Sequence, residues 1–256
     1  MPYYPADAGA LAPRDSANGS VSLTPMIAPK GTPVMVVPNP DRGYVFQSLA
    51  ITDADGAETV LTDLTFPMPA GVNRVQAVFA PKEFADVKPD AWYHDAVQWA
   101  VIRGVTEGTG ETTFSPDAAC TRAQAVTFLW RAAGSPEPTT TDNPFKDVSE
   151  DAYYRDAVLW AAEKGVTKGT APDAFSPDAP CSRAQIVTFL HRASDSPKAA
   201  GEMRFADVPA DAYYRGAVLW AVEKGITKGT DDTHFSPNKT CSRAEIVTFL
   251  QRTAAK

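Results

Sequence analysis

The chain has few of the residues that form reactive or metal-binding sites. Its 256 residues include only 3 cysteines and 3 histidines. It contains no Gly-x-Ser-x-Gly elbow, phosphate-binding loop or His-Glu-x-x-His motif, and these motifs carry much of the known hydrolase, nucleotide and zinc chemistry. We therefore expect no catalytic residue, no metal and no cofactor, and predict that the chain is not an enzyme.

Basic charge and long apolar runs are also scarce. The chain has 24 Lys and Arg against 31 Asp and Glu, a formal net charge of -7. Nucleic-acid-binding surfaces need a basic patch, so no nucleic-acid partner is expected. No run approaches the roughly 20 apolar residues that a membrane-spanning helix needs, so no membrane insertion is expected. The 44% of hydrophobic residues are nevertheless enough to build a buried core.

One sequence unit of about 60 residues is present three times. The run Cys120-Thr121-Arg122-Ala123-Gln124 returns 61 residues later from Cys181, and again 60 residues later from Cys241. Each run has Thr or Ser followed three residues later by Gln or Glu, a capping box that starts a helix. Phe-x-Asp-Val, an aromatic pair, a Gly-x-x-x-Gly turn and a Phe-Ser-Pro step recur in frame with it.

Each repeat is predicted to form a helix, a loop and a second helix. In the first repeat, apolar residues recur at helical spacing over 92–100, and Gly104 ends that helix. The irregular stretch 105–119 then leads to the second helix at the capping box. Two helices cannot hide their apolar faces alone, whereas three repeats can share one core. The fold class predicted for the whole chain is α+β, a small β domain followed by a mainly α body.

The three cysteines, Cys120, Cys181 and Cys241, occupy the same position in each repeat. Either each is a small buried apolar residue before the N-cap, or three thiolates form a trigonal site on a pseudo-threefold axis. An odd, evenly spread set has no close-pair ligand spacing, which favours the buried interpretation. The histidines do not recur between the repeats, so they predict no general base and no metal ligand.

Residues 20–81 predict a compact antiparallel β domain. Short alternating runs lie at 21–23, 34–37, 49–52, 59–61 and 75–79, with turn signals between them. Asp53 and Asp55 either bind calcium or simply form their turn, and the second is commoner. Residues 1–19 predict a flexible tail. The order of motifs in the β domain resembles small β repeats that serve as stalks or spacers in bacterial surface proteins.

The three helical repeats resemble the S-layer homology (SLH) domain, by which many bacterial surface proteins attach to cell-wall polymers. The resemblance covers about residues 82–256 and includes all the recurring motifs above. It implies repeats at 82–140, 141–200 and 201–256, closed into one pseudo-threefold body with one helix of each repeat at the centre. The family's Thr-Arg-Ala-Glu helix start ends in Gln at Gln124 and Gln185, and only Glu245 keeps the acid.

The main functional clue is an arginine on the first residue of each second helix, where the helix dipole disfavours a cation. Either this arginine forms an ion pair with the aspartate of a Phe-x-Asp-Val motif, or it binds an anion. The resemblance implies the second, because in SLH domains this arginine lines grooves that hold an acidic secondary cell-wall polysaccharide, often with a pyruvate ketal. A ketal carboxylate beside exposed helix amides would also account for the cation. The predicted ligand-binding residues are Arg122, Arg183, Arg243, Asp86, Asp147, Asp207, Gly108, Gly169, Gly229, Lys168 and Lys228.

Two sets of aromatic residues recur as well. Trp99, Trp160 and Trp220 lie on the apolar stripe of the first helix and are predicted to be core. Trp92, Tyr153 and Tyr213 precede that helix and either stack on a sugar or join the core, which is the commoner outcome. Glu107 stands where the other repeats have Lys168 and Lys228, so the first repeat's pocket is predicted to bind an anionic sugar most weakly.

The sequence thus predicts a noncovalent anchor that holds exported cargo to the bacterial cell wall through a polysaccharide. The alternative is a surface-layer or adhesion protein that uses the SLH body for self-association without a glycan. A third possibility is part of a wall hydrolase, with a catalytic domain outside these residues. The expected location is the extracellular cell surface. Because residues 1–7 do not read as a signal peptide, the chain is expected to be a fragment of a longer precursor or to have lost its export signal.

Overall fold

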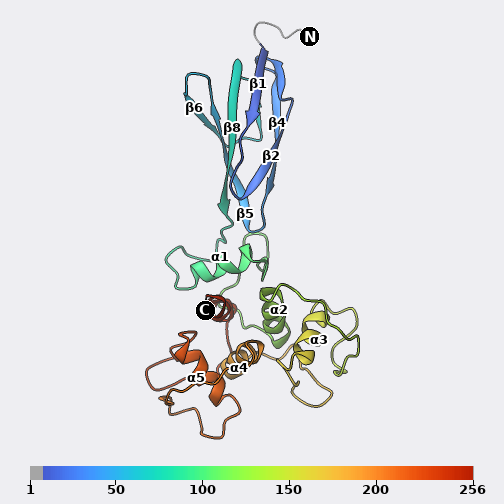
Figure 1. Cartoon of the computed structure of the whole chain (residues 1–256), viewed down its shortest axis with the longest axis vertical. Helices are drawn as coiled ribbons and strands as arrows, with labels where there is room; N and C mark the ends of the chain where they lie inside the picture. Colours follow the sequence, from blue (N-terminus) through green and yellow to red (C-terminus); the bar gives the residue numbers. More distant parts are fainter. Residues whose placement is uncertain (1–7, 256) are drawn as a thin grey trace. The chain divides into compact units, whose positions relative to one another are not determined.

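The computed structural model describes residues 8–255, which divide along the chain into two compact units, the first ending at Lys82 and the second beginning at Glu83. The described part of the first unit contains strands and that of the second contains helices (Figure 1). The α+β fold class predicted from the sequence is therefore confirmed. No helix within residues 8–255 has the length and apolar character needed to cross a bilayer.

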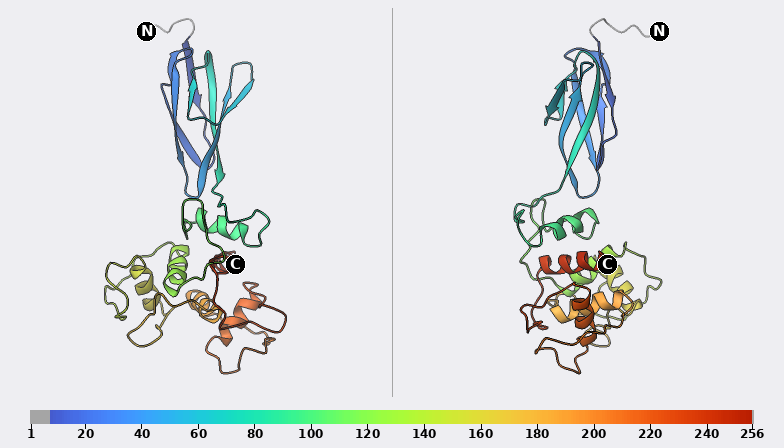
Figure 2. Two further views of the ribbon diagram at one scale, coloured as in Figure 1. Left: turned by 180° about the vertical axis from the view of Figure 1, so that it is seen from behind. Right: turned by 60° about the vertical axis from the view of Figure 1, so that its left-hand side comes forward.

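The first unit consists of two facing β-sheets (Figure 2). The five-stranded sheet has the order β3 (Ile27–Pro29), β1 (Ala8–Pro13), β8 (Gly71–Pro81), β5 (Tyr44–Thr52) and β6 (Glu58–Leu61). The three-stranded sheet has the order β2 (Gly19–Thr24), β4 (Pro33–Pro40) and β7 (Thr65–Pro67). Neighbouring strands are antiparallel except for β1 and β8, which pair in parallel. The five-stranded sheet is therefore mixed, whereas the sequence predicted only antiparallel strands.

Strand β1 also corrects the prediction of a flexible tail over residues 1–19. Residues 8–13 pair with β3 on one side and β8 on the other, and Leu11 is buried. The run Ala-Gly-Ala-Leu-Ala-Pro has almost no alternation of large apolar side chains, so its own sequence gives no strand signal. Its pairing comes from partners far along the chain. The part of the predicted tail at residues 1–7 lies outside the described residues.

Alternation of side chains along the strands builds the core between the sheets. The buried residues include Val34, Leu49 and Val75, each with 0% of its surface exposed. All five runs predicted as strands are found in β2, β4, β5, β6 and β8. The Asp53 carboxylate accepts hydrogen bonds from the amides of Asp55 and Ala57, at 3.0 and 2.9 Å. Asp53 therefore forms its turn, as the commoner of the two interpretations required.

The second unit has a pair of helices for each repeat, as predicted. The first helices are α1 (His94–Ile102), α3 (Arg155–Glu163) and α5 (Arg215–Glu223). The second helices are α2 (Arg122–Ala132), α4 (Arg183–Ala193) and α6 (Arg243–Ala254). Each second helix begins with a complete capping box, at Thr121, Ser182 and Ser242 respectively. The local sequence therefore determines where these helices start.

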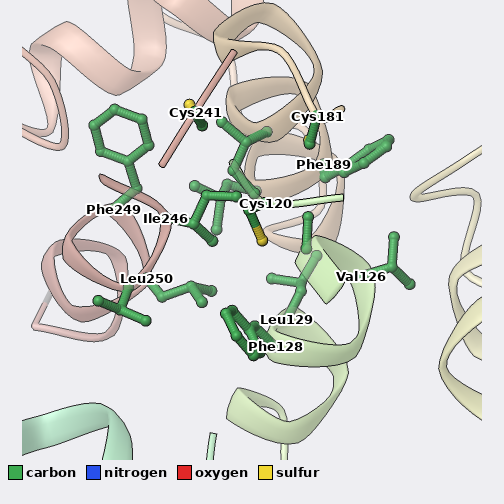
Figure 3. Packing of buried hydrophobic residues seen from close by; sticks show 14 of the residues in the cluster. Cys120, Val126, Phe128, Leu129, Cys181, Phe189, Cys241, Ile246, Phe249 and Leu250 are labelled. Carbon is green, nitrogen blue, oxygen red and sulfur yellow. The ribbon is translucent and has the colours of Figure 1, made fainter. Parts of the chain in front are cut away.

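The helices of the second unit form a closed ring. The three second helices, α2, α4 and α6, contact one another at the centre (Figures 1 and 3). Outside them, α3 packs on α2, α5 packs on α4 and α1 packs on α6. Each first helix thus covers the second helix of the preceding repeat, and the first repeat covers the last. This agrees with the pseudo-threefold body that the resemblance implied.

Backbone hydrogen bonds between the three cysteines join the repeats at the axis. The amide of Cys120 donates to the carbonyl of Cys241, that of Cys181 to Cys120, and that of Cys241 to Cys181, at 2.8 to 3.0 Å. All three side chains are fully buried, which confirms the buried interpretation. Figure 3 shows the thiols of Cys120 and Cys241 pointing in different directions. Within residues 8–255 no group of three His, Cys, Asp or Glu side chains is placed to hold a metal ion.

The buried cysteines should be chemically inert in the folded chain. Burial raises the pKa of the Cys120 and Cys181 thiols to about 12 and raises that of Cys241 as well. Because the thiolate is the reactive form, we expect no reaction with a thiol reagent at mildly alkaline pH. Titration in concentrated guanidinium chloride should then reveal all three. Rapid labelling of one thiol in the native chain would contradict this packing.

Candidate functional site

The arginine at the start of each second helix reaches into the next repeat around the ring. Arg122, Arg183 and Arg243 have only 2%, 3% and 4% of their surface exposed. Each Nε donates a 2.9 Å hydrogen bond to a phenylalanine carbonyl of the next repeat; the acceptors are Phe175, Phe235 and Phe114 respectively. A buried cation therefore crosses each repeat boundary of the closed ring.

Two phenylalanine rings surround each guanidinium. The centre of the Arg243 guanidinium lies 4.9 Å from the ring of Phe114 and 5.2 Å from that of Phe128. Arg122 and Arg183 have the equivalent pairs at 4.8 to 5.5 Å. Burial lowers the pKa of Arg122 and Arg243, but a guanidinium stays charged in a protein. The aromatic faces thus compensate part of the cost of burying the charge.

The aspartates of the Phe-x-Asp-Val motifs bind backbone amides in their own repeat. Asp86 accepts from the amides of Phe114 and Ser115 at 2.8 and 2.7 Å. Asp147 and Asp207 do the same one and two repeats later. None of the ion pairs within residues 8–255 joins these aspartates to the three arginines. The ion-pair interpretation is therefore wrong; aspartate and arginine hold opposite ends of the same loop peptide.

This arrangement predicts a stability role for the aspartates. Replacing Asp147 with alanine removes two hydrogen bonds to a charged acceptor, and we expect unfolding to become easier by about 2 kcal/mol. The exposed Asp151, in the neighbouring turn, is the matched control and should change stability by less than about 0.5 kcal/mol when truncated. Urea unfolding followed by circular dichroism measures both. Equal effects would show that the loop does not depend on Asp147.

The amides at the helix starts are not open to a ligand. The amides of Arg243 and Ala244 donate to the carbonyls of Ala118 and Pro116, at 3.0 Å each. The equivalent amides in α2 and α4 bind carbonyls in the same way, and the next amide binds the capping hydroxyl. A ketal carboxylate therefore cannot use these amides, and that explanation of the N-terminal arginines is wrong. Each guanidinium instead binds a carbonyl of the next repeat, not a group at its own helix end.

The glycines of the turn permit a close backbone approach. Gly108, Gly169 and Gly229 have φ of +100°, +79° and +88°. A Cβ atom at Gly169 would lie 2.4 Å from the carbonyl oxygen of Ala174 and 2.6 Å from the ring of Phe145. No other residue type fits this space. The glycine thus lets the turn pack against the phenylalanine of the Phe-x-Asp-Val motif.

Two grooves lie between the repeats, each beside one of these turns. The first, with a volume of about 330 Å³, is lined by residues that include Glu107, Gly108, Gln124, Arg131, Tyr153 and Arg243. The second, of about 190 Å³, is lined by residues that include Lys168, Gly169, Gln185, Phe189, Arg192 and Tyr213. The Arg122 guanidinium lies 5.5 Å from the Phe189 ring of the second groove. Ligand pockets are typically ~300–1,000 Å³, so the first groove lies at the lower end of this range and the second below it, and each suits a small ligand such as one sugar unit.

The third copy of this arrangement has a carboxylate where the first two have an amide. Glu245, at the position of Gln124 and Gln185, lies 3.4 Å from Arg183 and 3.1 Å from Lys239. It also lines a cavity with Trp92 and Asp117. The corresponding Lys228 is exposed, and its carbonyl accepts a hydrogen bond from Arg204. Arg183, the helix-start arginine of this third site, is thus already paired with a carboxylate of the chain itself.

The aromatic residues before the first helices are on the surface. Trp92, Tyr153 and Tyr213 have 64%, 64% and 65% of their surface exposed, so the core location favoured from the sequence is wrong for them. Their ring neighbours Tyr93, Tyr154 and Tyr214 pack against the core instead. Trp160 and Trp220 are buried and Trp99 packs on the core, as predicted. In each adjacent pair the second aromatic packs on the core and the first is exposed, and the spacing of the residues does not predict which of the two is buried.

Sequence reasoning missed a second arginine of the grooves. Arg131 lines the first groove and Arg192 the second. Each holds its position by donating to a carbonyl at the end of the turn region, Val105 or Val166, at 3.3 and 3.1 Å. With Arg252, these residues recur at the same spacing of 61 and 60 residues as the helix-start arginines. That recurrence was the signal.

The repeats match a known family. A family model described as the S-layer homology domain matches residues 83–126, 144–187 and 204–247, together just over half of the chain. A second model, described as a divergent InlB B-repeat domain, matches residues 10–83. The second match agrees with the resemblance of the β domain to repeats of bacterial surface proteins.

Several curated proteins are similar to the chain. An S-layer protein of Bacillus thuringiensis subsp. finitimus is 28% identical over 193 residues, 74% of this chain and 23% of that protein. A surface-layer 125 kDa protein of Lysinibacillus sphaericus is 37% identical over 108 residues, 42% of this chain and 9% of that protein.

Enzymes with this kind of region also exist. An endoglucanase of Bacillus sp. (strain KSM-635) is 28% identical over 207 residues, 77% of this chain and 22% of that protein. The chain thus spans less than a quarter of the length of these relatives. On the three matched repeats and their closed ring, the chain belongs to the S-layer homology family.

Proposed function

We propose that the chain is a noncovalent anchor that binds an acidic cell-wall polysaccharide in the grooves between its repeats. The observation that carries the proposal is the composition of the first two grooves. Each combines a buried arginine of one repeat with a second arginine and an exposed tyrosine of other repeats. Charged donors and an exposed ring are the groups that a carboxylate-bearing sugar requires.

In this proposal each group has its own role in binding. The helix-start arginine and the second arginine attract a carboxylate, such as that of a pyruvate ketal, while Tyr153 or Tyr213 offers a flat face to the sugar ring. The lysine of the second turn, Lys168, adds charge at the rim. The turn glycines and the Phe-x-Asp-Val aspartates shape the loop and contribute indirectly. Of the predicted binding residues, the arginines and Lys168 are thus the ones we propose to face a ligand.

Family membership and the S-layer relatives support a role at the bacterial cell surface. An enzyme name among the relatives does not make this chain an enzyme, because the shared region is only 22% of that endoglucanase. We propose that the chain itself is non-enzymatic and serves to attach a cargo. The β unit serves as a spacer in this proposal.

The proposal is tested with polysaccharide released from the cell wall of the chain's own host. Titration calorimetry should show binding to the native polymer and none after its carboxyl groups are reduced to alcohols. Raising the salt concentration should weaken the binding, because the contact is charge-assisted and partly exposed. Equal binding of the reduced polymer would contradict an acidic ligand.

The S-layer relatives also favour a second candidate, in which the SLH body assembles with other copies without a glycan. Analytical ultracentrifugation of the purified chain distinguishes the two. Assembly in the absence of polymer, together with no polymer binding, would favour the second candidate. A monomer that binds polymer supports the anchor.

A further inference from the structure

We infer that the three sites are unequal and that the second groove, formed by Lys168, Gln185, Arg192 and Tyr213 with Arg122, is the principal anion site. This inference rests on the proposed function and names the groove that performs it. The first groove and the third site each contain a carboxylate of the chain where the second groove has none. The carboxylates are Glu107 in the first groove and Glu245 at the third site, each a single substitution in a repeated motif.

The charges at the three sites differ in kind. The second groove is lined by two cations, Lys168 and Arg192, and by no carboxylate, and the buried Arg122 lies next to it, 5.5 Å from the ring of the lining residue Phe189. The first groove has Arg243 and Arg131, but its turn supplies Glu107 in place of the lysine. A carboxylate at the rim repels an incoming anion and reduces the field of the two arginines. The first groove is therefore weakened at its rim.

At the third site the carboxylate lies deeper. Glu245 binds Arg183 at 3.4 Å with its Oε1 atom, while its Oε2 atom accepts the capping hydrogen bond from the Ser242 amide at 2.9 Å. The side chain of Glu245 is only 15% exposed. An anionic ligand would have to displace this internal carboxylate or lie beside it, and either is costly. Arg183, the helix-start arginine of the third site, is thus already paired with Glu245.

Glutamine at the same position has the opposite effect. Gln185 uses its Oε1 atom for the capping bond from the Ser182 amide, at 3.0 Å. The atom equivalent to the arginine-binding oxygen of Glu245 is therefore the Gln185 amide nitrogen, which can only donate. Gln185 cannot pair with Arg122 and adds a donor for an anion. The departure from the family's acidic residue thus strengthens anion binding in this groove.

Arg122 is also the least satisfied of the three helix-start arginines. Arg183 makes side-chain hydrogen bonds to Phe235, Thr227 and Glu245. Arg243 makes two, to Phe114 and Thr106. Arg122 makes one within residues 8–255, to Phe175, and its buried Nη2 atom has no hydrogen-bond partner among these residues. A buried charged donor without a partner is costly, and an anion held in the adjacent groove would lower that cost by its charge.

The test uses the full chain and a methyl glycoside of a pyruvylated hexose as the probe. We expect one strong site per chain by titration calorimetry. Charge reversal by Lys168→Glu should weaken binding by about tenfold or more, since an attraction becomes a repulsion at close range. The equivalent change Lys228→Glu should weaken it by less than about threefold. Lys198→Glu, on an exposed linker, controls for the change in net charge.

Two further variants test the two inhibitory carboxylates by gain of function. Glu107→Lys should add a second site, and Glu245→Gln should add one at Arg183, with the capping box preserved because Gln works equally well there. These changes leave Arg122 and the second groove intact, so a variant that fails to fold is recognised because it also loses the native site in that groove. Stoichiometry is the readout.

Two results would overturn the inference in different ways. Equal losses from Lys168→Glu and Lys228→Glu, or three equal sites in the native chain, would show that the grooves are equivalent and would leave the anchor proposal intact. A native chain that binds neither the probe nor the released polymer would remove the proposed function and this inference with it.

Discussion

Replacing Arg243 with alanine is expected to lower the free energy of unfolding of the helical unit by about 3 kcal/mol. The side chain is 4% exposed, donates to Phe114 and Thr106 at 2.9 and 3.3 Å, and lies over two phenylalanine rings. Alanine would leave the Phe114 carbonyl without this donor and a cavity between the third and first repeats. Urea unfolding followed by circular dichroism measures the loss.

Arg243→Lys is the control for charge and Arg243→Met the control for volume. Lysine keeps a cation but cannot reproduce the planar contact with the rings, so it should recover less than half of the loss. Methionine should restore packing but no hydrogen bond. A change of less than about 1 kcal/mol in the alanine variant would show that the arginine is not needed for closure of the ring. Because these arginines are structural, their alanine variants are poor probes of binding, whereas Lys168 is a good one.

Removing the third repeat, residues 201–256, is expected to abolish cooperative unfolding of the helices that remain. In a linear array the other repeats would stay folded, because each contacts only its neighbours. Here α1 packs on α6, and the Cys120 amide bonds the carbonyl of Cys241. Without the third repeat, α1 has no α6 to pack on and α4 is no longer covered by α5. Thermal melting followed at the helical band of the circular dichroism spectrum should show no sharp transition.

The control for this truncation removes residues 1–82 instead. The described part of this segment, residues 8–82, forms a compact unit of its own, with a separate core, so the helical transition should remain. A sharp helical transition after loss of the third repeat would mean that two repeats fold without closure. The ring would then be a consequence of folding and not a condition for it.

Local signals in the sequence were sufficient for most of the fold. The capping boxes at Thr121, Ser182 and Ser242 fix the helix starts, because the bonds that they make lie within four residues. Five strands were predictable from alternation. Strand β1 was not, because Ala8–Pro13 obtains its pairing from β8, about 60 residues away.

The candidate site was predictable in part. The helix-start arginines recur at a position where a cation needs a partner, so the sequence points to them. Their actual acceptors, the carbonyls of Phe175, Phe235 and Phe114, belong to other repeats and follow only from closure of the ring. The meaning of glutamine or glutamate at positions 124, 185 and 245 likewise needs the geometry, since both residues complete the same capping box.

The most direct test of the central claim is co-sedimentation of the purified chain with cell-wall sacculi from its own host. The sacculi are compared before and after chemical removal of the secondary polymer, with native chain and Lys168→Glu in parallel. The account predicts that the native chain sediments only with polymer-bearing sacculi, and that Lys168→Glu remains largely in the supernatant. Undiminished sedimentation of the native chain with stripped sacculi would contradict it.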